Sequence, residues 1–140
     1  MILYIFKGAF MNSKISSPLA RLFLLYQARD WHGARSLLCD SAIMCWHSSG
    51  ECFSGGDAII HVNAVYPEGW RITLLEDNLL TDARIHVIAA VDHHEQRFLV
   101  NSFATLTDDN RIVRLDEYWA TCEEPQRWRV VLPGWSRLIG

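Results

Sequence analysis

The sequence has little charge and no cluster of basic residues. Only 21% of its 140 residues are charged, and the 13 lysines and arginines are scattered along a chain with a net charge of -3. Nucleic-acid-binding proteins need clustered Lys and Arg to neutralise phosphates. We therefore expect no nucleic acid among its partners.

Sequence motifs for phosphate, metal and nucleophile chemistry are also missing. There is no Gly-rich phosphate loop, no nucleophile elbow and no Cys-x-x-Cys pair. The four cysteines show no metal-like spacing with the six histidines, so we expect reduced, mostly buried thiols. His93 and His94 fall in a predicted turn, where solvent contact is expected rather than metal binding. We expect no metal and no cofactor.

No hydrophobic run is long enough to cross a bilayer. The N-terminal stretch "MILYIFKGAF" has ten residues with Lys7 inside it, which suits neither a spanning helix nor a signal peptide. Because a second Met stands at position 11, we treat residues 1–14 as an extension whose order the sequence leaves open. We expect a cytoplasmic protein with no membrane partner.

What is present indicates one globular domain. Half of the 140 residues are hydrophobic and six are Trp, which suits a single core in a chain too short for two ordinary domains. We expect the domain over residues 15–130, followed by a C-terminal tail over 131–140.

The first part of the chain has helical patterns. Ser17 and Pro18 favour a helix start, because Ser is a good N-cap and proline needs no hydrogen-bond partner at the first position. Helical spacing continues to about Arg29, and Asp30 can cap a second helix. A third helix is predicted in "SGGDAIIHVNAVY", residues 54–66.

The remaining patterns predict strands. "AIMCWH", residues 42–47, predicts a short strand after Asp40 and Ser41. Beyond Trp70, long runs of β-branched, aromatic and alternating residues are separated by turn-forming residues. Four strands follow from these runs: "WRITLLEDNLL", "ARIHVIAAVD", "RFLVNSFATLT" and "RIVRLDEYWAT".

The order of elements predicts an α+β domain in which three N-terminal helices pack on a strongly curved, mostly antiparallel sheet. Strands of this length must twist, so the sheet should form a concavity beneath the helices. Concave apolar clefts are where small ligands bind. The predicted partner is a small apolar or amphipathic molecule.

Several segments resemble one superfamily. The "SGGDAI" helix after a short strand, the "VYPEGWRI" turn into the sheet and the ending "RIVRLDEYWATCEEPQRWR" are similar to the nuclear transport factor 2-like superfamily, in its SnoaL-like branch. The resemblance covers roughly residues 18–130. It implies a cone-shaped fold with a deep pocket, often dimeric through the outer face of the sheet. Relatives include polyketide cyclases, ketosteroid isomerase, dehydratases and epoxide hydrolases beside non-catalytic modules, so the fold does not choose an activity.

The last predicted hairpin places Glu117 toward the interior. If its turn is centred on Asp109, Asn101 lies opposite Glu117, and each strand puts alternate residues on one face. The set expected to share the inner face with Glu117 is Asn101, Leu99, Phe103, Leu115 and Trp119. The resemblance agrees, because Glu117 matches a pocket carboxylate on the final strand of epoxide hydrolase-like relatives. The acid-Arg-acid arrangement of those relatives is not found, since "LLEDNLL" offers Glu76 and Asn78 on one face with no Arg between them.

Glu117 has two interpretations. A carboxylate among Trp119, Leu99 and Phe103 would be desolvated, which would raise its pKa toward the range of a general acid or base. Alternatively, hydrogen bonds from Asn101 or Arg97 would make Glu117 a structural group of the core.

Other candidates for the site are His86, Asn101 and Trp46. His86 reaches the pocket only if the preceding hairpin aligns it with Phe103, and an outer-face or interface position is the alternative. Trp46 should form a pocket wall, together with Glu76 and Asn78 as further ligand contacts. Tyr26 and Tyr66 have helical core spacing, so packing is expected of them, with the pocket mouth as the alternative.

Two functions follow as hypotheses. One is metal-independent acid-base catalysis of an isomerase, cyclase or hydratase/dehydratase type, with Glu117 as acid or base and Asn101 or His86 as polar partner. The other is a non-catalytic module for hydrophobic-ligand binding or dimerisation. A homodimer through the sheet is expected, because Val100, Phe98 and Tyr118 are assigned to the uncovered outer face.

Overall fold

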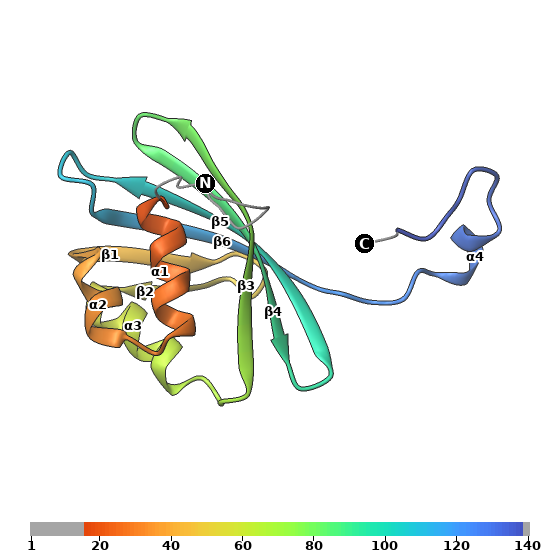
Figure 1. Cartoon of the computed structure of the whole chain (residues 1–140), viewed down its shortest axis with the longest axis horizontal. Coiled ribbons are helices and arrows are strands. Elements are labelled where there is room, and N and C mark those ends of the chain that lie inside the picture. The colour runs from red at the N-terminus through yellow and green to blue at the C-terminus, as the bar shows by residue number, and fades with distance from the viewer. Residues whose placement is uncertain (1–15, 139–140) are drawn as a thin grey trace.

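A computed structural model describes residues 16–138, and the predicted extension over 1–14 lies outside this range. The chain forms helices on one side of a single six-stranded sheet (Figure 1). In chain order the elements are α1 (Pro18–Gln27), α2 (Trp31–Ser36), β1 (Leu38–Trp46), β2 (Glu51–Ser54), α3 (Gly56–Val65), β3 (Trp70–Thr81), β4 (Arg84–His93), β5 (Gln96–Leu106), β6 (Ile112–Thr121) and α4 (Arg127–Val130). The predicted α+β class is confirmed. No helix within residues 16–138 is long and apolar enough to cross a membrane.

The first two helices begin where the capping residues predict. The Ser17 side chain accepts a hydrogen bond from the backbone N–H of Ala20, and Pro18 occupies the first position of α1. The backbone N–H of Ser17 also donates to Asp77 Oδ2 at 3.0 Å, which ties the start of α1 to β3. Asp30 caps α2 by accepting from the N–H of Gly33 at 2.9 Å.

Arg29 fastens the end of α1 to the start of β3. Its backbone has φ 59°, which ends the helix, and its guanidinium lies 3.3 Å from the ring centroid of Trp70. Nε and Nη2 donate to the two carboxylate oxygens of Glu68 at 3.0 and 2.8 Å, and Nη2 also donates to the carbonyl of Trp70. These contacts fix the position of Trp70 beneath the helices.

The sheet has the order β2-β1-β6-β5-β4-β3, in which β1 and β6 are parallel and all other neighbours are antiparallel. The four predicted strands of the meander are confirmed. The first strand is longer than predicted, because β1 begins at Leu38 and includes Asp40, whose carboxylate accepts from Arg35 Nη2 at 2.7 Å. The short strand β2 was not predicted, since only four residues pair after the turn at Gly50.

The predicted register of the last hairpin is wrong by one residue. Ser102, rather than Asn101, lies opposite Glu117. The cause is a bulge near the turn: Leu106 pairs with Ile112 and Thr105 with Arg114, so β6 carries one extra residue. A shift of one residue moves every partner to the other face of β5. Leu99, Asn101 and Phe103 therefore lie on the outer face.

The hydrophobic core lies between the helices and the inner face of the sheet. Its fully buried side chains come from both layers, and the largest are Leu19, Leu22, Leu38, Met44, Ile59, Ile112, Leu115, Val87 and Val100. Val100 thus belongs to the core, and Phe98 also packs against it. The prediction that these two residues cover the outer face is wrong, whereas Tyr118 is 47% exposed there.

The chain after β6 forms an extended C-terminal arm, residues 122–138, which points away from the sheet and helices (Figure 1). The arm contains the single-turn helix α4, and its apolar side chains Trp128, Val131 and Leu138 are exposed. The predicted start of the tail at residue 131 falls inside this arm, directly after α4.

Candidate functional site

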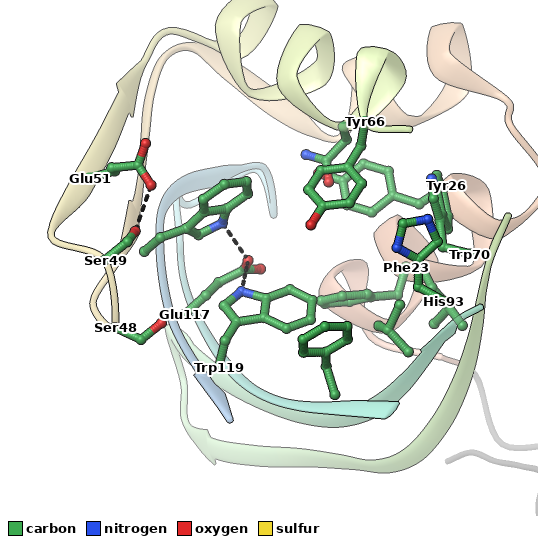
Figure 2. A pocket seen from close by; sticks show the side chains of 15 residues that line it. Phe23, Tyr26, Ser48, Ser49, Glu51, Tyr66, Trp70, His93, Glu117 and Trp119 are labelled. Atoms are coloured by element: carbon green, nitrogen blue, oxygen red, sulfur yellow. Dashed lines mark hydrogen bonds between the residues drawn. The ribbon is translucent and has the colours of Figure 1, made fainter. Parts of the chain in front are cut away.

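A cavity of about 280 Å³ lies between the helices and the inner face of the sheet (Figure 2). It is lined by residues from α1, from α3 and the segment after it, from the turn between β1 and β2, and from all six strands. The lining residues are Phe23, Tyr26, Trp46, Ser48, Ser49, Glu51, Asn63, Tyr66, Trp70, Ile72, Val91, His93, Phe98, Glu117 and Trp119. Most of this surface is aromatic or aliphatic, which suits a small apolar ligand.

Glu117 is a buried carboxyl group in the cavity wall. Its residue is only 3% exposed. Oε1 accepts hydrogen bonds from the indole Nε1 of Trp46 at 3.1 Å and of Trp119 at 3.3 Å, as the dashed lines in Figure 2 show. Oε2 accepts from the hydroxyl of Ser102 at 2.9 Å. The carboxyl group is therefore held by three neutral donors.

The sheet pairing explains why these donors meet. Trp46 lies directly beside Glu117 on the parallel neighbour β1, and Ser102 lies opposite it on β5. Trp119 stands two residues further along β6, where the side chain points to the same face. Three positions on three strands thus converge on one carboxyl group.

The electrostatics of Glu117 favour its neutral form. Burial raises the pKa of Glu117 above its ordinary value, while the donors Ser102, Trp119 and Trp46 oppose this rise. Among residues 16–138, the cavity lining includes no Lys or Arg that would offset the loss of hydration. A carboxyl group in this state can release or take up a proton closer to neutral pH than an exposed glutamate.

Two buried donors in the cavity wall have no hydrogen-bond partner within the described part of the chain. Among the hydrogen bonds of residues 16–138, none is made by the hydroxyl of Tyr26 or the indole N–H of Trp70. Burial raises the pKa of Tyr26 well above its ordinary value, and the charge of Glu117 adds to this. The hydroxyl of Tyr26 therefore stays protonated. Because buried polar groups are normally paired, both groups can serve a ligand oxygen.

The rim of the cavity adds further polar groups. Tyr66 points its hydroxyl into the cavity between Glu117 and His93 (Figure 2). The rings of Tyr66 and His93 have centroids 5.8 Å apart, and His93 Nε2 lies 3.2 Å from the carbonyl oxygen of Glu68. The prediction that His93 is a solvated turn residue is wrong, because it ends β4 and lines the cavity.

The structure separates the predicted site residues into two groups. Glu117, Trp46 and Trp119 line the cavity. Leu115 shares their face of the sheet but is fully buried in the core and is not among the lining residues.

The other predicted residues lie on the outer face, away from Glu117. His86 Nε2 lies 2.9 Å from Asn101 Oδ1, and His86 Nδ1 lies 3.3 Å from Asn78 Nδ2. Asn78 also donates to Glu76 at 3.1 Å, and the ring of Phe103 stacks on His86 with centroids 4.6 Å apart. His86 does align with Phe103, but both face outward, so His86 takes the alternative position on the outer face. The predicted inward placement of Asn101, Leu99 and Phe103 is wrong because of the one-residue shift in register between β5 and β6.

Sequence reasoning missed Ser102 and Trp70 as parts of the site, and it offered a pocket position for Tyr26 only as the alternative to packing. Ser102 was assigned to the wrong face by the register, and Tyr26 matched a packing position on α1. The sequence carries no signal for the missing partners of Tyr26 and Trp70, because that property depends on the shape of the space around them. No group of three or more His, Cys, Asp or Glu side chains in residues 16–138 is arranged to hold a metal ion.

Comparison with known proteins shows the fold. No family model matches the chain, and no curated protein matches its sequence. A structure of a proposed ketosteroid isomerase from Kribbella flavida has a TM-score of 0.76 at 20% identity, with 88% of each chain covered. The chain has the nuclear transport factor 2-like fold.

Further solved structures with this fold agree. A nuclear transport factor 2-like protein of unknown function from Burkholderia xenovorans has a TM-score of 0.74 at 16% identity, covering 88% of this chain and 93% of that one. A proposed SnoaL-like polyketide cyclase from Shewanella putrefaciens has a TM-score of 0.61 at 9% identity, covering 73% and 86%. The resemblance in the sequence to the nuclear transport factor 2-like superfamily is confirmed in the fold. At these identities the likeness does not transfer an activity.

Proposed function

We propose that the cavity binds a small, largely apolar molecule bearing a carbonyl group, and that Glu117 moves a proton on it. The observation that carries the proposal is a buried carboxyl group of raised pKa in the same cavity as two donors that have no hydrogen-bond partner among residues 16–138. A proton acceptor and oxygen-binding donors in one apolar site are what proton transfer beside a carbonyl requires. Isomerisation, cyclisation and loss or addition of water all include such a step.

The hydrogen bonds of Glu117 indicate which oxygen takes the proton. Each carboxylate oxygen has two lone pairs. Oε1 already accepts from both indoles of Trp46 and Trp119, whereas Oε2 accepts only from Ser102. We therefore assign Oε2 as the basic atom. The indoles hold the carboxyl plane, which keeps Oε2 in one orientation toward the ligand.

Tyr26 and Trp70 are the proposed donors to the ligand oxygen. When Glu117 removes a proton from the carbon beside a carbonyl, negative charge develops on the carbonyl oxygen. A neutral hydroxyl and an indole N–H, buried away from water, stabilise that charge strongly. Trp70 is already held by Arg29, so its N–H does not need to be reoriented during the reaction.

A non-catalytic binding module is the second candidate. This candidate is favoured by the mostly apolar lining of the cavity. It is also favoured by the three donors that already occupy much of the hydrogen-bonding capacity of the Glu117 carboxyl group. In that case Glu117 shapes the cavity and selects ligands with a hydrogen-bond donor. The two functions differ in the fate of a bound ketone. An enzyme would transfer a proton on it, whereas a binding module would leave it unchanged.

A bicyclic β,γ-unsaturated ketone is a suitable probe, because conversion to its conjugated isomer is followed by ultraviolet absorbance. We expect Glu117→Gln to bind the ketone, as judged by quenching of tryptophan fluorescence, but to lose conversion by at least 100-fold, within the typical contribution of a general base of about 10²–10⁴. Asp116→Asn is the matched control, since Asp116 is the neighbouring carboxylate on the outer face and bonds to Arg114 and His47. Binding without conversion by the unchanged protein would support the binding module instead.

The same proposal includes a homodimer through the outer face of the sheet, in the cytoplasm. Support comes from Leu99, Phe103 and Tyr118, which form an aromatic and aliphatic surface on β5 and β6. Phe103 and Tyr118 meet edge to face with ring centroids 5.9 Å apart. An apolar surface of this kind on a sheet face suits a symmetric contact between two copies.

A further inference from the structure

Two of the four cysteines lie side by side on the outer face of the sheet. Cys45 on β1 is paired directly with Cys52 on β2. The other two are Cys39, near the start of β1, and Cys122, directly after β6. All four are free thiols. The pair Cys45 and Cys52 is called here the hairpin thiol pair.

The backbone geometry at this pair suits a disulfide. The N–H of Gly55 donates to the carbonyl of Ala42 at 2.7 Å, so Ala42 and Gly55 form a hydrogen-bonded pair of the β1–β2 ladder. Because hydrogen-bonded and non-hydrogen-bonded pairs alternate, Cys45 and Cys52 occupy a non-hydrogen-bonded position, where opposite Cα atoms are about 4.5 Å apart. Disulfides need a Cα separation of about 4.4–6.8 Å.

The side chains are also in contact and differ in access. Hydrogen bonding with the Cys52 thiol, followed by burial, raises the pKa of Cys45. Cys45 is 7% exposed, whereas Cys52 is exposed on the edge strand β2. An oxidant in solution therefore meets Cys52 first, and Cys45 is placed to react second.

Arg114 partly opposes this rise in the pKa of Cys45. Its Nη2 lies 3.6 Å from Cys45 Sγ, and a cation beside sulfur stabilises the thiolate. Arg114 is held there by Asp116, which accepts from its Nε and Nη2 at 2.9 and 3.0 Å. The cation is thus fixed against the sulfur that must attack.

We propose that Cys45 and Cys52 form a reversible intramolecular disulfide when the protein meets a hydroperoxide. The Cys52 thiolate attacks the O–O bond, forming a sulfenic acid and releasing the alcohol or, from hydrogen peroxide, water. The Cys45 thiolate then attacks the Cys52 sulfur, forming the S–S bond and releasing hydroxide, which is protonated to water. Two electrons pass from the two thiols to the hydroperoxide, and a thiol reductant reverses the bond.

The location links this bond to the cavity. Trp46, which donates to Glu117, directly follows Cys45. The cavity-lining residues Ser48 and Ser49 lie in the turn between Cys45 and Cys52, and Glu51 begins β2 directly before Cys52. A disulfide between the two strands would restrain this turn. The hairpin thiol pair is thus a modification site at the wall of the cavity.

The test uses the whole protein treated with stoichiometric hydrogen peroxide, alkylated under denaturing conditions and cleaved after glutamate. Cleavage after Glu51 leaves Cys39 and Cys45 on one peptide and Cys52 on another. Fragmentation of the joined peptide in the mass spectrometer then identifies whether Cys45 or Cys39 is bonded to Cys52. We expect most of the oxidised protein to yield this joined peptide, with Cys39 and Cys122 alkylated. The joined peptide should disappear after reduction. Cys122→Ser, which removes the other exposed thiol, should keep the joined peptide.

Cys52→Ser should abolish the joined peptide and leave Cys45 alkylated. The proposal is overturned if oxidation stops at a sulfinic acid on Cys52 with Cys45 still free, or if the main product is a bond between two chains through Cys52 or Cys122. Hydrogen–deuterium exchange gives an independent measurement. Exchange of the amides of residues 47–51 should slow at least several-fold in the oxidised protein, and unchanged exchange would contradict the restraint of the turn.

Discussion

Ser102 lies directly opposite Glu117 across the β5–β6 pair, and its hydroxyl donates to Glu117 Oε2 at 2.9 Å. Both residues are buried on the inner face of the sheet. A buried carboxyl group with a neutral donor on each oxygen and no cation is stabilised only in part when it is charged. The protonation state of Glu117 should therefore change with pH, and its pKa should depend on the donors around it.

Glu117→Gln should keep the fold and its stability at neutral pH. The amide oxygen can accept from the indoles of Trp46 and Trp119, and the amide N–H can donate to Ser102, whose hydroxyl also accepts. The substitution removes a charge that burial disfavours, so stability should stay level or rise. A loss on the order of 1.5–3 kcal/mol, the contribution of a hydrogen bond to a charged group, would show instead that charged Glu117 anchors the core.

The pH dependence of stability should show the raised pKa of Glu117 directly. Because the folded-state pKa lies above the unfolded value, the folded protein binds this proton more tightly. Its contribution is complete below the unfolded pKa and is lost as pH rises through the folded pKa. The free energy of unfolding of Glu117→Gln, measured in urea and compared with that of the unchanged protein, should therefore become more favourable to the variant as pH rises from acid to neutral.

Asp116→Asn provides a control of opposite sign. Arg114 first, and then His47, holds the pKa of Asp116 below its ordinary value. That contribution is present above the unfolded pKa and is lost as pH falls through the folded pKa. Asp116→Asn should therefore lose stability at neutral pH and lose less in acid. The same trend for both variants would contradict the assignment.

Ser102→Ala should raise the pKa of Glu117 further, because it removes the donor that opposes the effect of burial most strongly. Above that pKa, the variant should lose about 1.5–3 kcal/mol of stability, and the loss should shrink when Glu117 is protonated. Tryptophan fluorescence measures the titration, since two indoles donate to the carboxyl group. An unchanged titration midpoint would show that Ser102 does not control the proton.

Tyr26→Phe should separate stability from ligand binding. The Tyr26 hydroxyl is buried without a partner among residues 16–138, so its removal should leave stability level or raise it by about 1 kcal/mol. Binding of the ketone probe should weaken, because a donor to its oxygen is lost. A clear fall in the unfolding midpoint would instead show that the hydroxyl has a structural partner.

Tyr118→Glu should dissociate the proposed homodimer. Tyr118 is 47% exposed, so the substitution should not disturb the core, whereas two added charges at a symmetric contact repel each other. Sedimentation at micromolar concentration should give a dimer for the unchanged protein and a monomer for the variant. A monomeric unchanged protein would contradict the proposal.

Local patterns predicted most of the fold but only part of the site. Ser17, Pro18 and Asp30 act through contacts within a few residues, so the helix starts were readable from the sequence. The alternation of β6 also placed Glu117 inward correctly. The partner across the hairpin was wrong because a single extra residue in β6 changed the register, and this replaced Asn101 by Ser102. Trp70 and Tyr26 required the three-dimensional packing of α1 against β3.

The most direct test of the account is the pKa of Glu117, measured by NMR on protein labelled with carbon-13 at the glutamate side-chain carboxyl groups. The resonance of Glu117 is the one that Glu117→Gln removes. We expect this group to titrate above the other glutamates, and to titrate higher still when the apolar ketone fills the cavity and excludes water. A pKa at or below the ordinary glutamate value, unchanged by the ketone, would contradict the assignment of Glu117 as the proton-transferring group.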